Sequence, residues 1–389
     1  MQPALSGLYI HIPWCVKKCP YCDFNSHEPR NDQGQANKKL PEKKYLQALL
    51  DDADSEIAAL ASPLEISSVF IGGGTPSLMS GEFYASLFEQ LRKRFIFNDN
   101  AEITIEANPG AVDESHFADY IKAGINRLSL GVQSFSDDSL QRLGRIHDAK
   151  SIYRAFETSR KSGFDNINID LMHGLPEQSI EQGLFDLDSA FALAPEHISW
   201  YQLTIEKNTA FYKQPPTLPA ENLLDNLFIR GLERLAAAGY SQYEISAFSL
   251  ANKQSQHNKN YWQFGDYIGI GAGAHGKLTH IDSDGLNKTA LRRWKTRLPE
   301  DYMNKKTKLA GSSQIAVDEL PLEFMMNALR LNAGFSTALF ETITGLSIAA
   351  VEPKLRQLQK QGLIEQAADI YRPTEKGRLF LNDVIEAFA

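Results

Sequence analysis

The three cysteines of this 389-residue chain, Cys15, Cys19 and Cys22, lie in one short stretch with the spacing C-x3-C-x2-C. No fourth cysteine exists to pair with them, and an odd, clustered set does not make a disulfide framework. Thiolates are soft ligands that suit zinc or iron and sulfur. The spacing therefore indicates a metal centre.

Two kinds of metal centre are open from the cysteines alone. A structural zinc site is closed and four-coordinate, and His11 or His27 would supply its fourth ligand. A 4Fe–4S cluster held by three cysteines would instead leave one iron open to another molecule. The elements that position the cysteines give the context for choosing between the two.

Short extended runs recur along the chain, with segments of helical periodicity between them. This alternation predicts an α/β fold with a parallel sheet, in which six strand and helix units form a partial (β/α)6 TIM-like barrel. The runs cover residues 8–12, 68–72, 102–106, 127–132, 166–172 and 197–205.

Polar and glycine residues cluster at the ends of the first five runs. Because the carboxyl ends of parallel strands face one crevice, where ligands bind, we expect these segments to converge on a single site. The segments are 15–22, 72–75, 106–109, 133–135 and 170–176.

The end of the chain has the pattern of a small winged-helix-like α+β domain: three helices, two short strands and a final helix. We expect three parts, namely a barrel with the cysteine loop at 1–250, an irregular connecting region at 251–317 and the C-terminal domain at 318–389. Residues 321–389 contain seven Lys or Arg and eight Asp or Glu. Without a basic face, this domain is expected to have a structural or lid role rather than to bind DNA.

Composition narrows the class of protein. The formal charge of -8 and the pI of about 5.7 argue against nucleic acid as a partner. The mean hydropathy is -0.32, and no apolar run approaches the ~20 residues that span a bilayer. The first residues lack the basic start of a signal peptide, so we expect a cytoplasmic protein with no transmembrane segment.

Several ordered motifs extend the cysteine signal over nearly the whole chain. YIHIPWCVKKCPYC, IGGGTPS, EANP, GVQSF, GRIH and DLMHGLP together resemble the radical S-adenosylmethionine (SAM) superfamily, and within it the coproporphyrinogen dehydrogenase group. The resemblance implies a 4Fe–4S cluster on Cys15, Cys19 and Cys22, whose open iron chelates the amino and carboxylate groups of SAM. It disfavours the zinc site.

The resemblance also gives expected cofactor contacts to residues near the strand ends. Backbone groups at Gly72, Gly73, Gly74 and Thr75 would approach the methionyl part of SAM, although three glycines alone make only a tight turn. Glu106 would accept hydrogen bonds from the ammonium or a ribose hydroxyl.

For other residues, each expected contact has an ordinary structural alternative. Arg145 presents a planar fork that fits the methionine carboxylate, and a helix-surface position is its alternative. Gln133 and Asp170 would hold ribose hydroxyls. Tyr9 and Tyr21 would touch the nucleoside, although core packing also explains either aromatic ring.

Two departures separate this sequence from the coproporphyrinogen dehydrogenases. Those enzymes carry a further cysteine two positions after the third cluster cysteine, where this chain has Phe24, and they have a longer N-terminal extension than the 14 residues before Cys15. The related HemW-type haem chaperones lack both features and carry an H-N-x-x-Y motif, which is present here as HNKNY from His257 to Tyr261.

The resemblance therefore implies a protein that binds haem and passes it to an acceptor protein, which would be respiratory or associated with a membrane. The alternative is oxidative decarboxylation of coproporphyrinogen. Imidazole and phenolate both ligate haem iron, so His257 and Tyr261 are the expected haem contacts. His275, in GIGAGAHG, is a second candidate.

Overall fold

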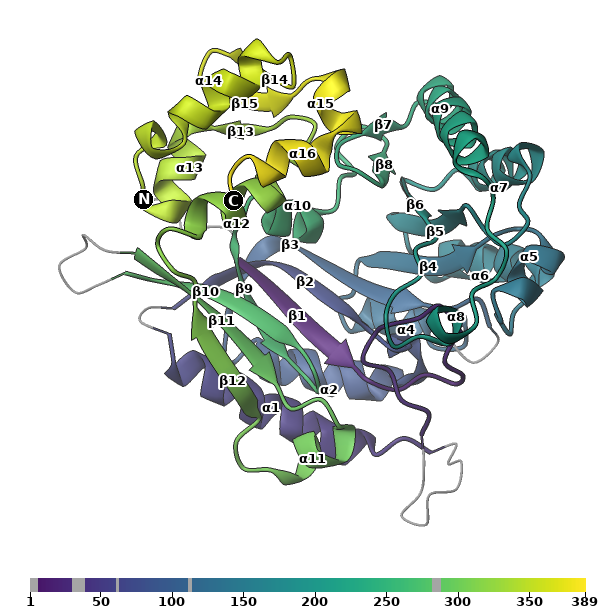
Figure 1. Ribbon diagram of the computed structural model, residues 1–389. Helices are drawn as coiled ribbons and strands as arrows, with labels where there is room; N and C mark the ends of the chain where they lie inside the picture. Colours follow the sequence, from purple (N-terminus) through teal and green to yellow (C-terminus); the bar gives the residue numbers. More distant parts are fainter. Residues whose placement is uncertain (1–5, 30–38, 61–62, 111–113, 282–287) are drawn as a thin grey trace.

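The computed structural model describes residues 6–29, 39–60, 63–110, 114–281 and 288–389. Within these ranges a 12-stranded sheet forms the centre of the molecule, and a smaller unit with its own three-stranded sheet lies beside it (Figure 1). Strands β1 to β6 lie next to one another in sequence order, and each pair is parallel. The expected partial (β/α)6 barrel is confirmed.

The barrel strands are β1 (Ser6–Ile12), β2 (Glu65–Gly73), β3 (Ile96–Ala107), β4 (Arg127–Gln133), β5 (Ile167–His173) and β6 (His197–Gln202). Their connections contain α1 (Glu42–Ala58), η1 (Pro76–Leu78), α2 (Gly81–Leu91), α4 (Phe117–Lys122), α5 (Asp137–Arg142), α6 (Ala149–Ser162) and α7 (Ile180–Leu193). After β6 come α8 (Ala210–Lys213), α9 (Glu221–Ala237), β7 (Ser241–Gln242) and β8 (Ala247–Ser249).

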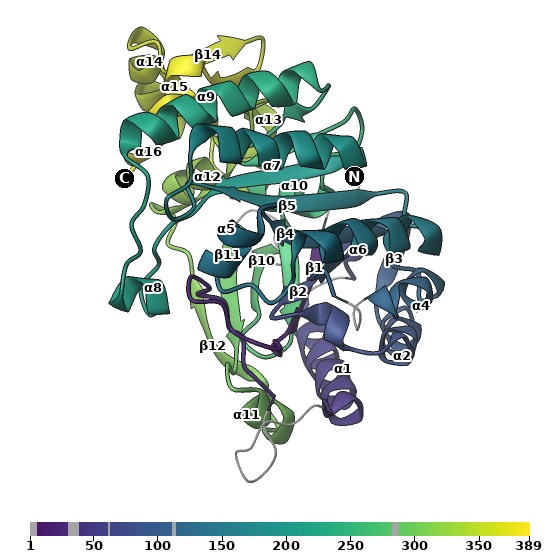
Figure 2. The ribbon, with the colours of Figure 1, turned by 90° about the vertical axis from the view of Figure 1, so that its right-hand side faces the viewer.

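Strands β1, β4 and β5 are buried almost throughout, because the connecting helices cover the sheet (Figure 2), whereas the first residues of β3 are exposed. Leu8, Ile10 and Ile12 of β1 belong to one core cluster with the apolar faces of these helices. Local signals also set the helix bounds. Helix α7, for example, begins with a capping box between Ser179 and Gln182.

The segment 251–317, which we expected to be irregular, contains regular elements that complete the large sheet. Strand β9 pairs in parallel with β1, and β10, β11 and β12 extend the sheet with antiparallel pairing. The elements are α10 (Gln256–Trp262), β9 (Asp266–Ile270), β10 (His275–Ile281), β11 (Lys288–Lys295), α11 (Pro299–Asn304) and β12 (Leu309–Gln314). Short strands with glycines and many charges lack the alternation that marks a strand, so the expectation was wrong.

The C-terminal unit has the expected three helices, short strands and final helical segment. It has its own apolar core, in which Phe324 packs edge-on against Phe335 and Phe340. Phe264 and Ile315, which precede residue 318, also belong to this core, and the boundary at 318 stays a proposal. Its elements are α12 (Leu320–Ala328), β13 (Phe335–Ser336), α13 (Thr337–Thr344), η2 (Ile348–Ala350), α14 (Glu352–Lys360), β14 (Ile364–Ala367), β15 (Ile370–Pro373), α15 (Glu375–Leu379) and α16 (Leu381–Glu386).

None of the helices in the described ranges combines the length and the apolar character that crossing a membrane requires.

Candidate functional site

The carboxyl ends of the barrel strands open into one cavity of about 430 Å³. The expected convergence of these segments is therefore present in the structure. Most of the residues that we assigned to the cluster and to SAM line this cavity, namely Cys15, Cys19, Tyr21, Cys22, Gly73, Gly74, Thr75, Glu106, Gln133, Arg145 and Asp170. Tyr9, Gly72, His257 and Tyr261 do not line it.

The loop after β1 presents the three cysteines to this cavity. Its shape is held by backbone bonds, in which the amide of Cys15 donates to the carbonyl of His27 (3.0 Å) and the amide of Cys22 to that of Cys19 (3.1 Å). All three thiols are free and partly exposed, and the hydroxyl of Thr75 donates to Cys15 Sγ at 3.2 Å. Three free thiols on one loop at the wall of this cavity match the donor set of a three-cysteine iron–sulfur cluster.

The histidines that we considered as zinc ligands are engaged elsewhere. His11 uses both ring nitrogens, because Nδ1 lies 3.0 Å from the Tyr9 hydroxyl and Nε2 lies 2.8 Å from the carbonyl of Asn25. Burial lowers the pKa of His11 to about 4. Nε2 of His27 lies 3.2 Å from Oδ1 of Asn25. Among the described residues, no three His, Cys, Asp or Glu side chains are grouped so that they could hold one metal ion.

Close packing against the cysteine loop explains the glycines at the end of β2. Gly73 has a φ of +120°, and a Cβ there would lie 2.6 Å from Cε1 of His11. A Cβ on Gly74 would lie 2.3 Å from the carbonyl oxygen of Trp14. Side chains at these positions would push the end of β2 away from β1 and from the segment that follows β1. The approach of these backbone groups to SAM stays a prediction.

Two partly buried carboxyl groups, those of Glu106 on β3 and Asp170 on β5, lie in the cavity. Asp170 accepts hydrogen bonds from the Ser129 hydroxyl (2.8 Å) and from Nδ2 of Asn168 (2.9 Å), whereas Glu106 accepts one from the amide of Gly73 (3.2 Å). Burial raises the pKa of Glu106 to about 8, and the nearby charge of Asp170 adds to the shift. A cationic ligand beside Glu106 would favour its ionised form.

Arg145 lies inside the cavity and not on an outer helix surface. Its Nη2 donates to Oδ1 of Asn108 (2.5 Å) and to the carbonyl of Gly131 (2.9 Å). Its Nη1 lies 3.5 Å from both Cys19 Sγ and the Tyr21 hydroxyl. A guanidinium between the strand ends and the cysteine loop is placed to bind a carboxylate that reaches the cluster.

A break in the strand register aims Gln133 into the cavity. The pairing of β4 with β5 shifts between Leu130 and Gln133, and Gln133 has a φ of +69°. Its Oε1 accepts a hydrogen bond from the Tyr201 hydroxyl (2.8 Å). Bulges and left-handed residues of this kind concentrate near functional sites.

Asn108 and Tyr201 line the cavity, but the sequence had given neither a role. Asn108 belongs to the EANP motif, so the motif itself could have pointed to it. Tyr201 comes from β6, where no polar motif marks the strand end. Only the tertiary structure shows that its hydroxyl meets Gln133.

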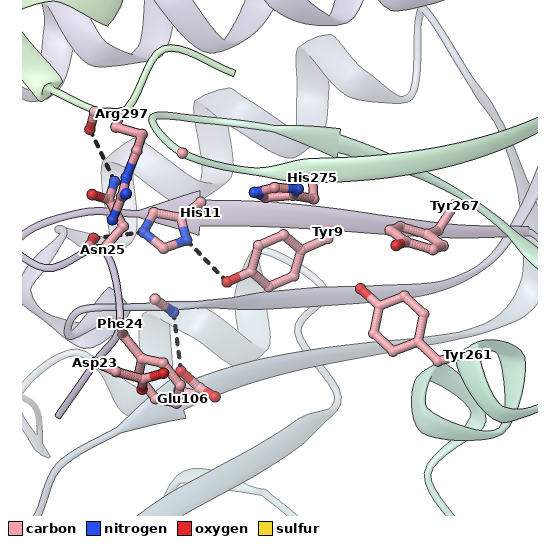
Figure 3. A pocket seen from close by; sticks show the side chains of 12 residues that line it. Tyr9, His11, Asp23, Phe24, Asn25, Glu106, Tyr261, Tyr267, His275 and Arg297 are labelled. Atoms are coloured by element: carbon pink, nitrogen blue, oxygen red, sulfur yellow. Dashed lines mark hydrogen bonds between the residues drawn. The ribbon is translucent and has the colours of Figure 1, made fainter. Parts of the chain in front are cut away.

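A second cavity, of about 470 Å³, adjoins the first and shares Asp23, Phe24, Gly73 and Glu106 with it. Figure 3 shows the side chains that line it. They come from distant parts of the chain and include Tyr9, His11, Tyr261, Tyr267, His275 and Arg297. Tyr9, which we expected at the SAM nucleoside, lines this second cavity instead.

His257 and Tyr261, the two residues of the HNKNY motif that we expected to contact haem, differ in their exposure. His257 is 1% exposed inside the first turn of α10; its Nδ1 lies 3.1 Å from the Ser68 hydroxyl and its ring stacks on Phe70. Burial lowers its pKa to about 3, and Nε2 has no hydrogen-bond partner. Tyr261 packs edge-on against His257, with ring centroids 4.6 Å apart, and reaches the second cavity.

Comparison with known proteins shows the superfamily to which this fold and site belong. Residues 9–187 match the Radical SAM superfamily and residues 315–380 match the HemN C-terminal domain. Over 99% of its length, the chain superposes with a TM-score of 0.79 on 90% of a structure described as coproporphyrinogen III oxidase (HemN) from Escherichia coli. At 23% identity, that likeness shows the fold. The fold and the cysteine site thus define a radical SAM protein.

Sequence relatives narrow the assignment within that class. The chain is 47% identical to the heme chaperone HemW of Escherichia coli, with 99% of this chain and 98% of the relative covered, and 46% identical to that of Haemophilus influenzae over the same shares. It is 33% identical to the Bacillus subtilis protein of the same name, with 99% of each covered. The chain belongs to the HemW family.

Membership of the radical SAM superfamily brings a 4Fe–4S cluster and SAM as cofactors. The cavity suits both, because it combines three free thiols with a guanidinium, two carboxyl groups and polar amides.

Proposed function

We propose that the protein is a haem chaperone, which binds haem and passes it to an acceptor protein. The observation that carries this proposal is the second cavity, whose aromatic and imidazole side chains lie beside the cysteine cavity without including any cysteine. The relatives named heme chaperone HemW, which align over nearly their full length, support haem as the cargo.

In this proposal the first cavity holds the cofactors. Cys15, Cys19 and Cys22 bind the cluster, which when present supplies an open iron that chelates SAM and an electron for cleaving its carbon–sulfur bond. Arg145 binds the methionine carboxylate and Glu106 the ammonium. The other proposed SAM contacts in this cavity are Tyr21, Gly73, Gly74, Thr75, Gln133 and Asp170. Gly72, which precedes Gly73, and Tyr9, from the adjoining second cavity, complete the proposed set.

The second cavity would receive the haem. Tyr261 is the member of the HNKNY motif that reaches this cavity, and its ring offers a flat apolar surface. His257 lies beneath it and supports the Tyr261 ring, so contact of His257 with iron would require α10 to move.

The acceptor would be a haem-requiring protein of a respiratory system or membrane, and transfer would take place in the cytoplasm. There the three thiols remain reduced and free to hold the cluster.

An anaerobic titration tests the proposal. The cluster is reconstituted, haem is added stepwise, and visible spectra are recorded, while coproporphyrinogen turnover is assayed on the same sample with a reductant. We expect saturable haem binding without turnover. The matched control is the Cys19→Ser protein, which separates haem binding from the cluster because Cys19 does not line the second cavity.

Two results would count against the proposal. Absence of saturable haem binding by protein with full iron and sulfide content would remove the chaperone function. Conversion of coproporphyrinogen at catalytic rates would make the protein an enzyme.

A further inference from the structure

The second cavity contains one imidazole that is both exposed and free of hydrogen bonds within the described part of the chain, that of His275. His11, in the same cavity, is buried and bonded through both nitrogens. His257 lines neither cavity. An imidazole ligates iron only through an accessible, unprotonated nitrogen, and His275 alone among these three offers one to a large ligand in this conformation.

The backbone holds His275 firmly at the start of β10. The preceding turn is closed by a bond from the amide of Ala274 to the carbonyl of Gly271 (3.0 Å), and the Lys295 amide donates to the carbonyl of Ala274 (2.9 Å). A Cβ on Gly269 would lie 2.0 Å from the carbonyl oxygen of His275, so β9 packs directly against it. The backbone that carries the His275 ring is thus held in place by its neighbours.

The charge around His275 favours its neutral form. Partial burial lowers its pKa, and the positive charges of Arg297 and Arg292 lower it further. Neutral imidazole is the form that donates a lone pair to a metal.

Arg297 adds a cation to the wall of the cavity. Its side chain is exposed, and its guanidinium has no ion pair with a carboxylate in the described ranges. Its carbonyl accepts a bond from Nδ2 of Asn25 (2.9 Å), which ties this segment to the loop after the cluster cysteines (Figure 3). An unpaired guanidinium is suited to bind a carboxylate.

Aromatic side chains complete the cavity. Tyr261 and Tyr267 pack edge to face with ring centroids 4.5 Å apart, and Tyr9 lies on the neighbouring strand β1. Phe24 is 60% exposed and lies where the two cavities meet. A flat, apolar ring system could cover these surfaces and remove them from water.

We infer that this cavity is the haem subsite, in which His275 ligates the iron and Arg297 pairs with a propionate. This inference rests on the proposed function and gives it a place in the molecule. It brings the haem next to the cofactor cavity, because Phe24, Gly73 and Glu106 belong to both walls.

The test compares binding of ferric haem and of metal-free protoporphyrin to the cluster-loaded protein. His275→Ala should weaken ferric haem binding by about tenfold or more and shift its Soret band, but leave metal-free protoporphyrin unchanged. Arg297→Gln should weaken both by about tenfold, because the lost charge-assisted bond involves the propionate. His280→Ala is the control, since His280 lies on the same strand with opposite side-chain parity and outside the cavity.

Different outcomes separate the subsite from the function. If the His275→Ala protein keeps the wild-type Soret band and haem affinity, the assigned haem subsite is wrong, although the chaperone function stands. Loss of haem binding in a His257→Ala protein with normal iron content and a normal unfolding midpoint would strengthen that conclusion. If the wild-type protein itself binds no haem saturably, the proposed function fails. If His275→Ala weakens the binding of ferric haem and of metal-free protoporphyrin equally, His275 does not ligate the iron.

Discussion

The replacement Glu106→Gln tests the electrostatics of the cofactor cavity. Glutamine keeps the size of the side chain and can still accept the bond from the Gly73 amide, but it cannot ionise. In the protein without SAM, burial and the charge of Asp170 raise the pKa of Glu106 from its ordinary value of 4.5 to about 8. The variant removes the titrating carboxyl group while changing little else.

The sign of the effect follows from proton binding. Between pH 4.5 and pH 8 the folded state holds a proton on Glu106 that the unfolded chain has lost, so the stability of the wild type falls as pH rises. Each pKa unit corresponds to ~1.4 kcal/mol, so the upper limit of the effect is ~5 kcal/mol. Over two pH units inside this window, the wild type should lose up to about 3 kcal/mol relative to Glu106→Gln.

Urea unfolding of both proteins without SAM, at pH 5.5, 6.5 and 7.5, measures this difference. Taking the difference cancels every other titrating group that the two proteins share. A free-energy difference between wild type and variant that does not change with pH would refute the reasoning. So would a change of opposite sign.

The same carboxyl group links SAM binding to protons. If the ammonium of SAM pairs with Glu106, binding at pH 7 should release on the order of one proton, because the carboxyl must ionise. Calorimetry in two buffers of different ionisation enthalpy measures this number. Glu106→Gln should bind SAM more weakly and without that release; unchanged release would place the proton elsewhere.

Three further variants test other parts of the structure. Cys19→Ser should lose most of its iron, by iron and sulfide analysis, while the C-terminal unit stays folded; full iron content would contradict the ligand assignment. Gly231→Ala should cost ~1–3 kcal/mol in urea unfolding, because its Cβ would lie 2.0 Å from the Trp200 ring, and wild-type stability would show that α9 can shift freely. Glu102→Ala should cost ~3 kcal/mol and speed amide exchange in α10, since Glu102 pairs with buried Arg127 and accepts bonds from the first amides of that helix; unchanged exchange would exclude the capping role.

Local patterns were sufficient for much of the fold. The runs at 8–12, 68–72 and 127–132 lie within β1, β2 and β4, because buried parallel strands are continuous apolar segments that stand out in the sequence. Helix α12 and its neighbours likewise follow from apolar periodicity. Strands such as β9 and β11 escaped detection because their stability comes from partners and not from their own composition.

The sequence by itself determined the chemistry of the first cavity. Cys15, Cys19 and Cys22 are close along the chain, so their spacing alone indicates a metal centre, and the motifs at the strand ends follow from the rule that parallel strands open on one side. Each of these motifs consists of residues close together in the sequence, so it can be recognised without the structure.

Only the tertiary structure decided the second cavity and the accessibility of each histidine. Tyr9, Tyr261, His275 and Arg297 meet there because β9 pairs with β1, a contact between residues more than 250 positions apart. The same packing buries His257 and leaves His275 exposed. Sequence pattern shows which face of a strand is apolar, but the free energy of pairing depends on the whole sheet, and so the choice of partner is made only when the chain folds.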